Sequence, residues 1–262
     1  MFLGGGYLLV CLIMWLIENR LVFYPTRAAE LWNERPVETI QDVNFTTPEG
    51  TQIHAWWLPS TPDAPVLLLF PGNAGNLSGR GETIVRMRER LGTSVLIFDY
   101  PGYGKSEGKP NEPACYDAGE GALAWLRQEK GIGSEHVILY GESLGGGVAT
   151  EMAFRHPCRA LVLVKSFTSL PAAAKCHYRW LPCHWLMSNR FDSISKLPDI
   201  RCPVFVVGAT ADSVVPFEHS EALFKAANEP KQIFRDAGSD HNDPLADAVW
   251  DELRAFLART SH

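Results

Sequence analysis

The sequence predicts an α/β fold in which a mostly parallel central sheet carries helices on both faces. Short runs that are apolar at every position recur along the chain, and longer segments of helical character separate them. A continuous apolar run is typical of a strand buried on both of its faces. Regular alternation of such strands with helices is typical of a doubly wound sheet with right-handed crossovers.

The expected strands follow one another from about residue 40 onward. Val43–Phe45 and Ile53–Trp57 alternate in polarity across a Pro-Glu-Gly turn, which predicts an antiparallel hairpin. Apolar runs predict five buried strands, at 66–70, 95–98, 137–140, 161–164 and 204–208, and a short last strand is expected at 232–234. Helices are expected between them, near 77–91, 116–130, 144–156, 217–227 and 244–258.

Residues 167–200 interrupt this alternation. They are rich in Pro, Trp, His and Cys, with weak helical periodicity around 171–190. Because the segment follows the carboxyl end of a strand, where open α/β sheets bind ligands, we expect a small lid over the site. The alternative is a structural excursion that covers the edge of the sheet.

The first seventeen residues carry no charged side chain. As a helix they would be about 26 Å long, just short of the bilayer's hydrocarbon core. We therefore expect residues 1–24 to form a single-pass membrane anchor, followed by a folded domain over 38–262. Arg20, Arg27 and Arg35 follow the segment, which favours a cytoplasmic domain by the positive-inside rule. The alternative is a hydrophobic helix packed on the domain.

The charge balance and the cysteines exclude other classes. With 24 Lys and Arg against 30 Asp and Glu, the net charge is -6, so we expect no nucleic-acid partner. Cys176 and Cys183, with His177 and His184 beside them, match no common zinc spacing, so no metal is expected. We expect free thiols, with a disulfide between these two cysteines as the alternative.

The strongest chemical motif is Gly141-Glu142-Ser143-Leu144-Gly145, placed directly between a predicted strand and a predicted helix. A serine at so sharp a strand-to-helix turn has strained backbone geometry and an exposed hydroxyl. The flanking glycines remove Cβ atoms that would clash where strand and helix approach each other. Ser143 is therefore the candidate nucleophile.

A serine nucleophile needs a base, and the base needs an acid that orients it. Asp212 lies just beyond the strand at 204–208, and His241 follows the short last strand. Each of the three residues follows the carboxyl end of a strand, so we expect Ser143, Asp212 and His241 to meet along one edge of the sheet. Asp99, at the end of another strand, is the alternative acid, although it is better suited to anchoring the glycine-rich loop that follows it.

When Ser143 attacks a carbonyl carbon, the negative charge that develops on the carbonyl oxygen requires backbone N–H donors. The N–H of Leu144, directly after the nucleophile, is the first candidate. The second is expected from the loop that follows the strand at 66–70, where Asn73 is our choice and Ala74 the alternative.

Taken together, the stretches PGNAGN, FDYPGYGKSEG, GESLGGG, GATADSVVP and DHND resemble the α/β-hydrolase superfamily. Within it the chain is most similar to membrane-anchored Bem46/ABHD13-like serine hydrolases, whose anchor precedes a stretch like the one at 18–25. The resemblance extends from about residue 18 to the carboxyl terminus and implies the α/β-hydrolase fold with the three triad positions named above. Two departures are visible: Pro71 stands where the family usually has His, and Lys165 stands where it often has an acidic residue.

These features predict a serine hydrolase that cleaves carboxylic esters or thioesters through an acyl-enzyme, without a metal or organic cofactor. The anchor and an apolar lid would suit a lipid-like or acylated small molecule. A serine peptidase of the same fold, a catalytically idle binding protein and a membrane-tethered interaction module are the alternatives. The sequence makes no prediction of oligomeric state.

Overall fold

The computed structural model describes residues 2–260 and is built on one eight-stranded sheet. All neighbouring strands are parallel except in the pairs β2–β3 and β3–β6. The strand order is β10-β9-β8-β7-β4-β6-β3-β2, with the bounds β2 (Gln41–Thr46), β3 (Gln52–Leu58), β4 (Val66–Phe70), β6 (Ser94–Phe98), β7 (Val137–Glu142), β8 (Ala160–Val164), β9 (Val204–Ala209) and β10 (Lys231–Asp236).

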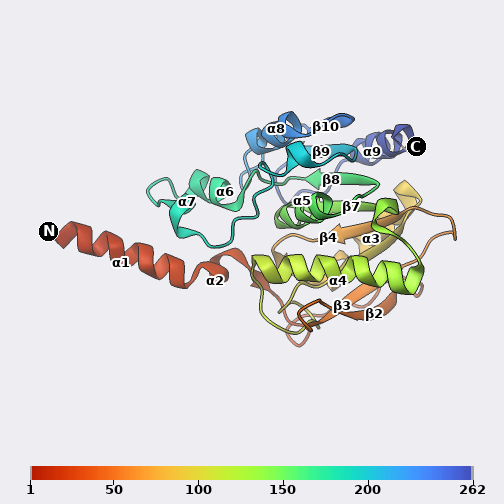
Figure 1. Cartoon of the computed structure of the whole chain (residues 1–262), viewed down its shortest axis with the longest axis horizontal. Helices are drawn as coiled ribbons and strands as arrows, with labels where there is room; N and C mark the ends of the chain where they lie inside the picture. Colours follow the sequence, from red (N-terminus) through yellow and green to blue (C-terminus); the bar gives the residue numbers. More distant parts are fainter. Residues whose placement is uncertain (1, 261–262) are drawn as a thin grey trace.

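Helices cover both faces of this sheet (Figure 1). One face packs against α4 (Glu112–Lys130), α5 (Leu144–Arg155) and α8 (Phe217–Ala226), and the other against α3 (Gly81–Leu91) and α9 (Asp247–Arg259). In β4, Leu68 and Phe70 join the first core while Leu67 and Leu69 join the second. Two covered faces explain why this strand is apolar at every position, and the predicted mostly parallel sheet with helices on both faces is confirmed.

The segment at 167–200 extends beyond the carboxyl ends of the strands. It contains α6 (Leu170–His177), α7 (Cys183–Leu186) and a 3₁₀ turn at Leu197–Asp199. Figure 1 places α6 and α7 at the same end of the sheet as the first two helices of the chain. Movement of this segment as a lid stays a prediction.

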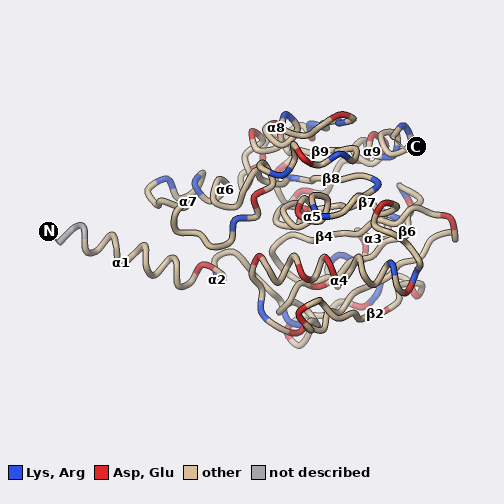
Figure 2. Tube along the Cα trace, in the orientation of Figure 1, with Lys and Arg blue, Asp and Glu red and all other residues tan. Residues whose placement is uncertain are grey.

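The prediction of a single-pass membrane anchor is wrong. The apolar helix α1 (Phe2–Leu16) carries no charge, as Figure 2 shows, but has only 15 residues and is about 22 Å long. Ile17 leaves helical geometry (φ −101°, ψ 7°), and α2 (Glu18–Val22) begins with a buried carboxylate. No helix in the described chain is both long and apolar enough to span a bilayer. The inference of a cytoplasmic domain, which depended on that span, loses its basis.

The amino-terminal helices are joined to the 167–200 segment instead. The carboxylate of Glu18 accepts hydrogen bonds from the backbone N–H groups of Ser188 and Asn189, at 2.9 and 2.8 Å, and from the side-chain amide of Asn189 at 2.9 Å. The hydroxyl of Tyr7 donates to the carbonyl of Trp180 at 2.9 Å. Glu18 is 7% exposed, so its charge is stabilised mainly by these donors. The boundary predicted between residues 24 and 38 stays a prediction.

Replacement of Glu18 by Ala tests this attachment. Two buried donors of Asn189 and the part-buried N–H of Ser188 would lose their acceptor, so we expect the free energy of unfolding to fall by about 2–4 kcal/mol. Urea denaturation measures the change. The matched control Glu34→Ala, at an exposed position, should stay within about 0.5 kcal/mol of the wild type. Equal stability of the two variants would show that these contacts do not hold the helices in solution.

Candidate active site

Ser143 occupies the turn between β7 and α5 in a backbone conformation that side-chain-bearing residues rarely adopt. Its φ is +50° and its ψ −116°, and its N–H donates to the carbonyl of Val164 at 2.9 Å. A Cβ at Gly145 would lie 2.0 Å from the carbonyl oxygen of Phe70, and one at Gly141 would lie 2.4 Å from that of Gly145. Only glycine permits the close approach that projects the serine hydroxyl from the edge of the sheet.

The structure brings the three expected residues of the triad together. The Nε2 atom of His241 lies 3.0 Å from Ser143 Oγ, and its Nδ1 lies 2.8 Å from Asp212 Oδ2. An ionised carboxylate can only accept, so Nδ1 carries the proton and Nε2 of the neutral ring accepts from the serine hydroxyl. The other carboxylate oxygen of Asp212 accepts from the N–H groups of Val214 and Val215, which fixes its orientation.

The loop that carries His241 is held from two sides. The carboxylate of Asp240 accepts from the N–H and hydroxyl of Ser213 and from the N–H of His241. These bonds hold the pKa of Asp240 below its usual value, and the bond from the Ser213 N–H contributes most. The ammonium of Lys165 donates to the carbonyls of Asp240 and Asp243, both at 2.8 Å. Lys165 therefore fixes the backbone on either side of His241.

In the sequence, Lys165 stands out only as a departure from a family pattern. It is 5% exposed and has a φ of +49° directly after β8. No motif marks a lysine that bonds to carbonyls 75 and 78 residues away, so sequence reasoning misses this role. No motif marks the ion pair between Arg80 and Glu142 either, although its 2.8 Å contact lies beside Ser143.

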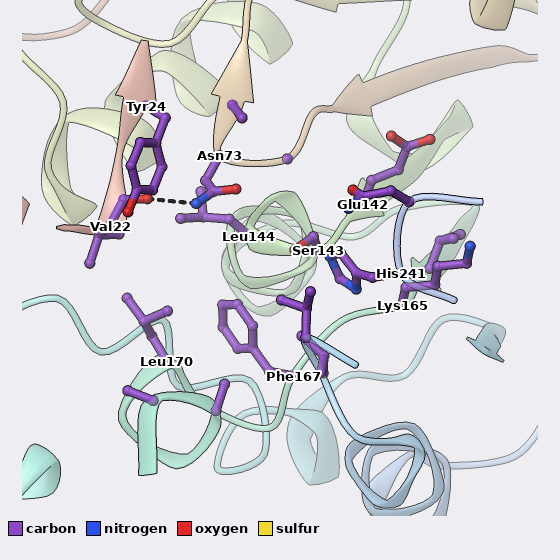
Figure 3. Close-up of a pocket in the computed structure, with 18 of the residues that line it drawn as sticks. Val22, Tyr24, Asn73, Glu142, Ser143, Leu144, Lys165, Phe167, Leu170 and His241 are labelled. Carbon is purple, nitrogen blue, oxygen red and sulfur yellow. Dashed lines mark hydrogen bonds between the residues drawn. The ribbon is translucent and has the colours of Figure 1, made fainter. Parts of the chain in front are cut away.

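The two expected oxyanion donors lie next to Ser143 (Figure 3). Leu144 is the first residue of α5, whose initial N–H groups have no acceptor within the helix. The side-chain amide of Asn73 donates to the carbonyl of Val22 at 2.7 Å, while the backbone carbonyl of Asn73 accepts from the Tyr24 N–H and the Tyr103 hydroxyl. Because this bond holds the Asn73 side chain against the end of α2, the backbone N–H of Asn73 is the group expected to face an oxyanion.

The amino-terminal segment reaches the same loop. The two-residue strand β1 (Tyr24–Pro25) pairs in parallel with β5 (Ala74–Gly75), directly after Asn73. A Cβ at Gly72 would lie 3.7 Å from the Ser143 Cβ, so this loop passes directly beside Ser143. The end of α2 and strand β1 thus hold the loop from which the second oxyanion donor is expected.

Asp99, the alternative acid, lies elsewhere. Its carboxylate accepts from the N–H of Leu77 at 2.7 Å and faces His54 Nδ1 at 3.9 Å, with burial raising its pKa. A Cβ at Gly104 would lie 1.9 Å from one of its oxygens. Asp99 is thus packed against the glycine-rich loop, whereas Asp212 is the carboxylate bonded to His241.

The cysteine-rich stretch holds free thiols. Cys176 and Cys183 are unbonded to each other, and a sulfur–sulfur contact of 3.2 Å instead joins Cys158 and Cys202. His177 reaches the carbonyl of Val214 at 2.7 Å. Within residues 2–260, no group of three or more His, Cys, Asp and Glu side chains is arranged to hold a metal ion.

Ser143 opens onto a cavity of about 1110 Å³. Its wall includes side chains from α1 and α2, the loop at 72–74, α3, α6 and α7, and the loop that carries His241. A cavity of this size beside a serine–histidine pair accommodates a small organic substrate.

Comparison with known proteins places the chain in a family. A family model described as alpha/beta hydrolase fold matches residues 65–182. An uncharacterized protein of Mycobacterium tuberculosis is 35% identical over 257 residues, which cover 96% of this chain and 91% of that protein. The alpha/beta hydrolase domain-containing protein 17B of Homo sapiens is 31% identical over 235 residues, covering 89% and 80%. The chain belongs to the α/β hydrolase family.

Among solved structures, this α/β hydrolase shares its fold with the Pyrococcus furiosus esterase Pf2001. The TM-score is 0.74 at 18% identity, over 92% of this chain and 99% of that one. These matches support the wider family, while the narrower resemblance to Bem46/ABHD13-like enzymes stays a prediction.

Gly145→Ala tests the packing that shapes this site in the α/β hydrolase. The added Cβ would meet backbone atoms of Phe70 and Pro71, so we expect the free energy of unfolding to fall by about 3 kcal/mol in urea denaturation. At Gly79 a Cβ meets nothing within 4 Å, and Gly79→Ala should change stability by less than about 1 kcal/mol. Similar losses for both variants would contradict the close approach at Ser143.

Proposed function

We propose that this α/β hydrolase cleaves carboxylic esters or thioesters through an acyl-enzyme on Ser143. The proposal rests on the continuous hydrogen-bonded chain Ser143–His241–Asp212 at the edge of a large cavity. An esterase with the same fold supports the reaction class by analogy.

In the proposed reaction, Ser143 Oγ attacks the carbonyl carbon while His241 Nε2 takes the hydroxyl proton. The negative charge on the former carbonyl oxygen is stabilised by the N–H groups of Leu144 and Asn73. When the tetrahedral intermediate collapses, His241 donates its proton to the leaving alcohol or thiol. Water then attacks the acyl-enzyme, with His241 again as base, and releases the carboxylic acid and free Ser143. Asp212 orients the imidazole and stabilises its cationic form.

Labelling by a fluorophosphonate probe tests the nucleophile. The wild type should be labelled and should hydrolyse p-nitrophenyl esters. Ser143→Ala should lose all labelling and at least about 10³-fold in kcat. Ser134→Ala, at a half-exposed serine in another part of the chain, should behave as the wild type does. Labelling that survives in Ser143→Ala would place the reactive group elsewhere.

Replacing each carboxylate by its amide distinguishes the role of Asp212 from that of Asp99. Asp212→Asn should lower kcat by about 10³–10⁴-fold, because the amide stabilises the wrong imidazole tautomer. Asp99→Asn, compared per folded molecule, should retain most of the wild-type kcat because Asp99 does not contact His241. Ester turnover with active-site titration measures both. A larger loss in the Asp99 variant would reverse the assignment.

A further inference from the structure

The cavity has two chemically different halves that meet at Ser143. One half is lined by apolar side chains from the amino-terminal helices and the 167–200 segment: Met14, Leu21, Leu170, Ala173, Leu181 and Met187. The other half, which also includes Val85, Pro244 and Leu245, has most of the charged side chains. They come from the 3₁₀ helix Leu77–Arg80, α3 and the loop after β10: Arg80, Glu82, Arg86, Glu89, Asn242 and Asp243. Figure 3 shows Val22, Phe167 and Leu170 on one side of Ser143, and Glu142, Lys165 and His241 on the other.

The position of His241 orients the substrate between these halves. His241 must donate a proton to the leaving group, so the leaving group lies on the polar side of the carbonyl carbon. The acyl chain stays attached to the same carbon and extends away from the leaving group, into the apolar half. An acyl chain is the substrate part whose burial there is favourable, because each methylene removed from water contributes to binding.

We propose that the apolar half is an acyl-chain site and that Met14 of α1 and Leu21 of α2 form its outer wall, which sets the longest chain accepted. This inference rests on the proposed ester hydrolysis. It assigns to the amino-terminal helices a role in substrate selection.

Several contacts hold the backbone that carries this wall, while the Leu21 side chain itself is 39% exposed. Met14 packs against a small apolar cluster of Cys11, Leu181 and Cys183, which joins α1 to the 167–200 segment. Near Leu21, the Glu18 carboxylate is bonded to Asn189, and the carbonyl of Val22 is bonded to Asn73. The same backbone therefore borders the acyl site on one side and clamps the oxyanion loop on the other.

The test compares p-nitrophenyl esters of increasing chain length, from acetate and butyrate to laurate and palmitate, at fixed detergent concentration. The readout is the ratio of kcat/KM for palmitate to that for butyrate, which is independent of the fraction of folded protein. Leu21→Trp and Met14→Trp fill the apolar half and should each lower this ratio at least tenfold. Leu21→Met, which nearly keeps the side-chain volume, should retain the wild-type ratio.

Leu16→Trp is the matched control. Leu16 belongs to the same helix as Met14 but is 67% exposed and does not line the cavity, so its replacement should leave the ratio unchanged. Palmitate binding to Ser143→Ala, measured by calorimetry, should likewise be weakened at least tenfold by Leu21→Trp and not by Leu16→Trp.

Two results would overturn the inference, and they are distinguishable from failure of the proposed function. An unchanged ratio in both Trp variants, with turnover still dependent on Ser143, would show that the acyl chain does not lie against this wall. An equal fall for Leu16→Trp would show a general effect of the helix. Absence of any Ser143-dependent ester turnover would instead refute the proposed function, and with it the basis of this site.

Discussion

The close approach of β7, α5 and the loop after β4 is the constraint on which the site depends. Gly145 lies against the carbonyl of Phe70, and Ser143 accepts a positive φ at the turn. This geometry directs the serine hydroxyl away from the sheet and starts α5 with free N–H groups beside it. Because β9 and β10 are parallel to β7, their carboxyl ends bring Asp212 and His241 to the same edge. The placement of these three side chains follows from strand direction and from the glycines at 141 and 145.

The amino-terminal segment belongs to this assembly. Glu18 joins it to Asn189, and Asn73 joins it to the loop beside the nucleophile. Each bond links residues that are distant in sequence, and Glu18, Val22 and Asn73 border the same cavity. A charged group at Glu18 would be costly in an isolated apolar helix, whereas here its charge is met by backbone and amide donors.

The sheet and the triad could be predicted because they depend on local patterns. The run at 66–70 is apolar throughout because it is buried on two faces, and the motif around Ser143 requires glycine at fixed spacing. The amino-terminal prediction failed because hydropathy measures only avoidance of water. It does not separate a helix in lipid from one that borders a cavity. The pair β1–β5 and the bonds of Lys165 have no sequence signal, since two-residue strands lack periodicity and a lysine that bonds to carbonyls resembles a surface lysine.

The most direct measurement is to trap the acyl-enzyme. The wild-type protein would be mixed with a p-nitrophenyl ester, quenched in acid within the first turnover, and analysed by intact-mass spectrometry and peptide mapping. The account predicts one acyl group per chain, on the peptide that contains Ser143 and at that residue. An acyl group on another side chain such as Cys176, or ester turnover with no acyl adduct at any quench time, would contradict it.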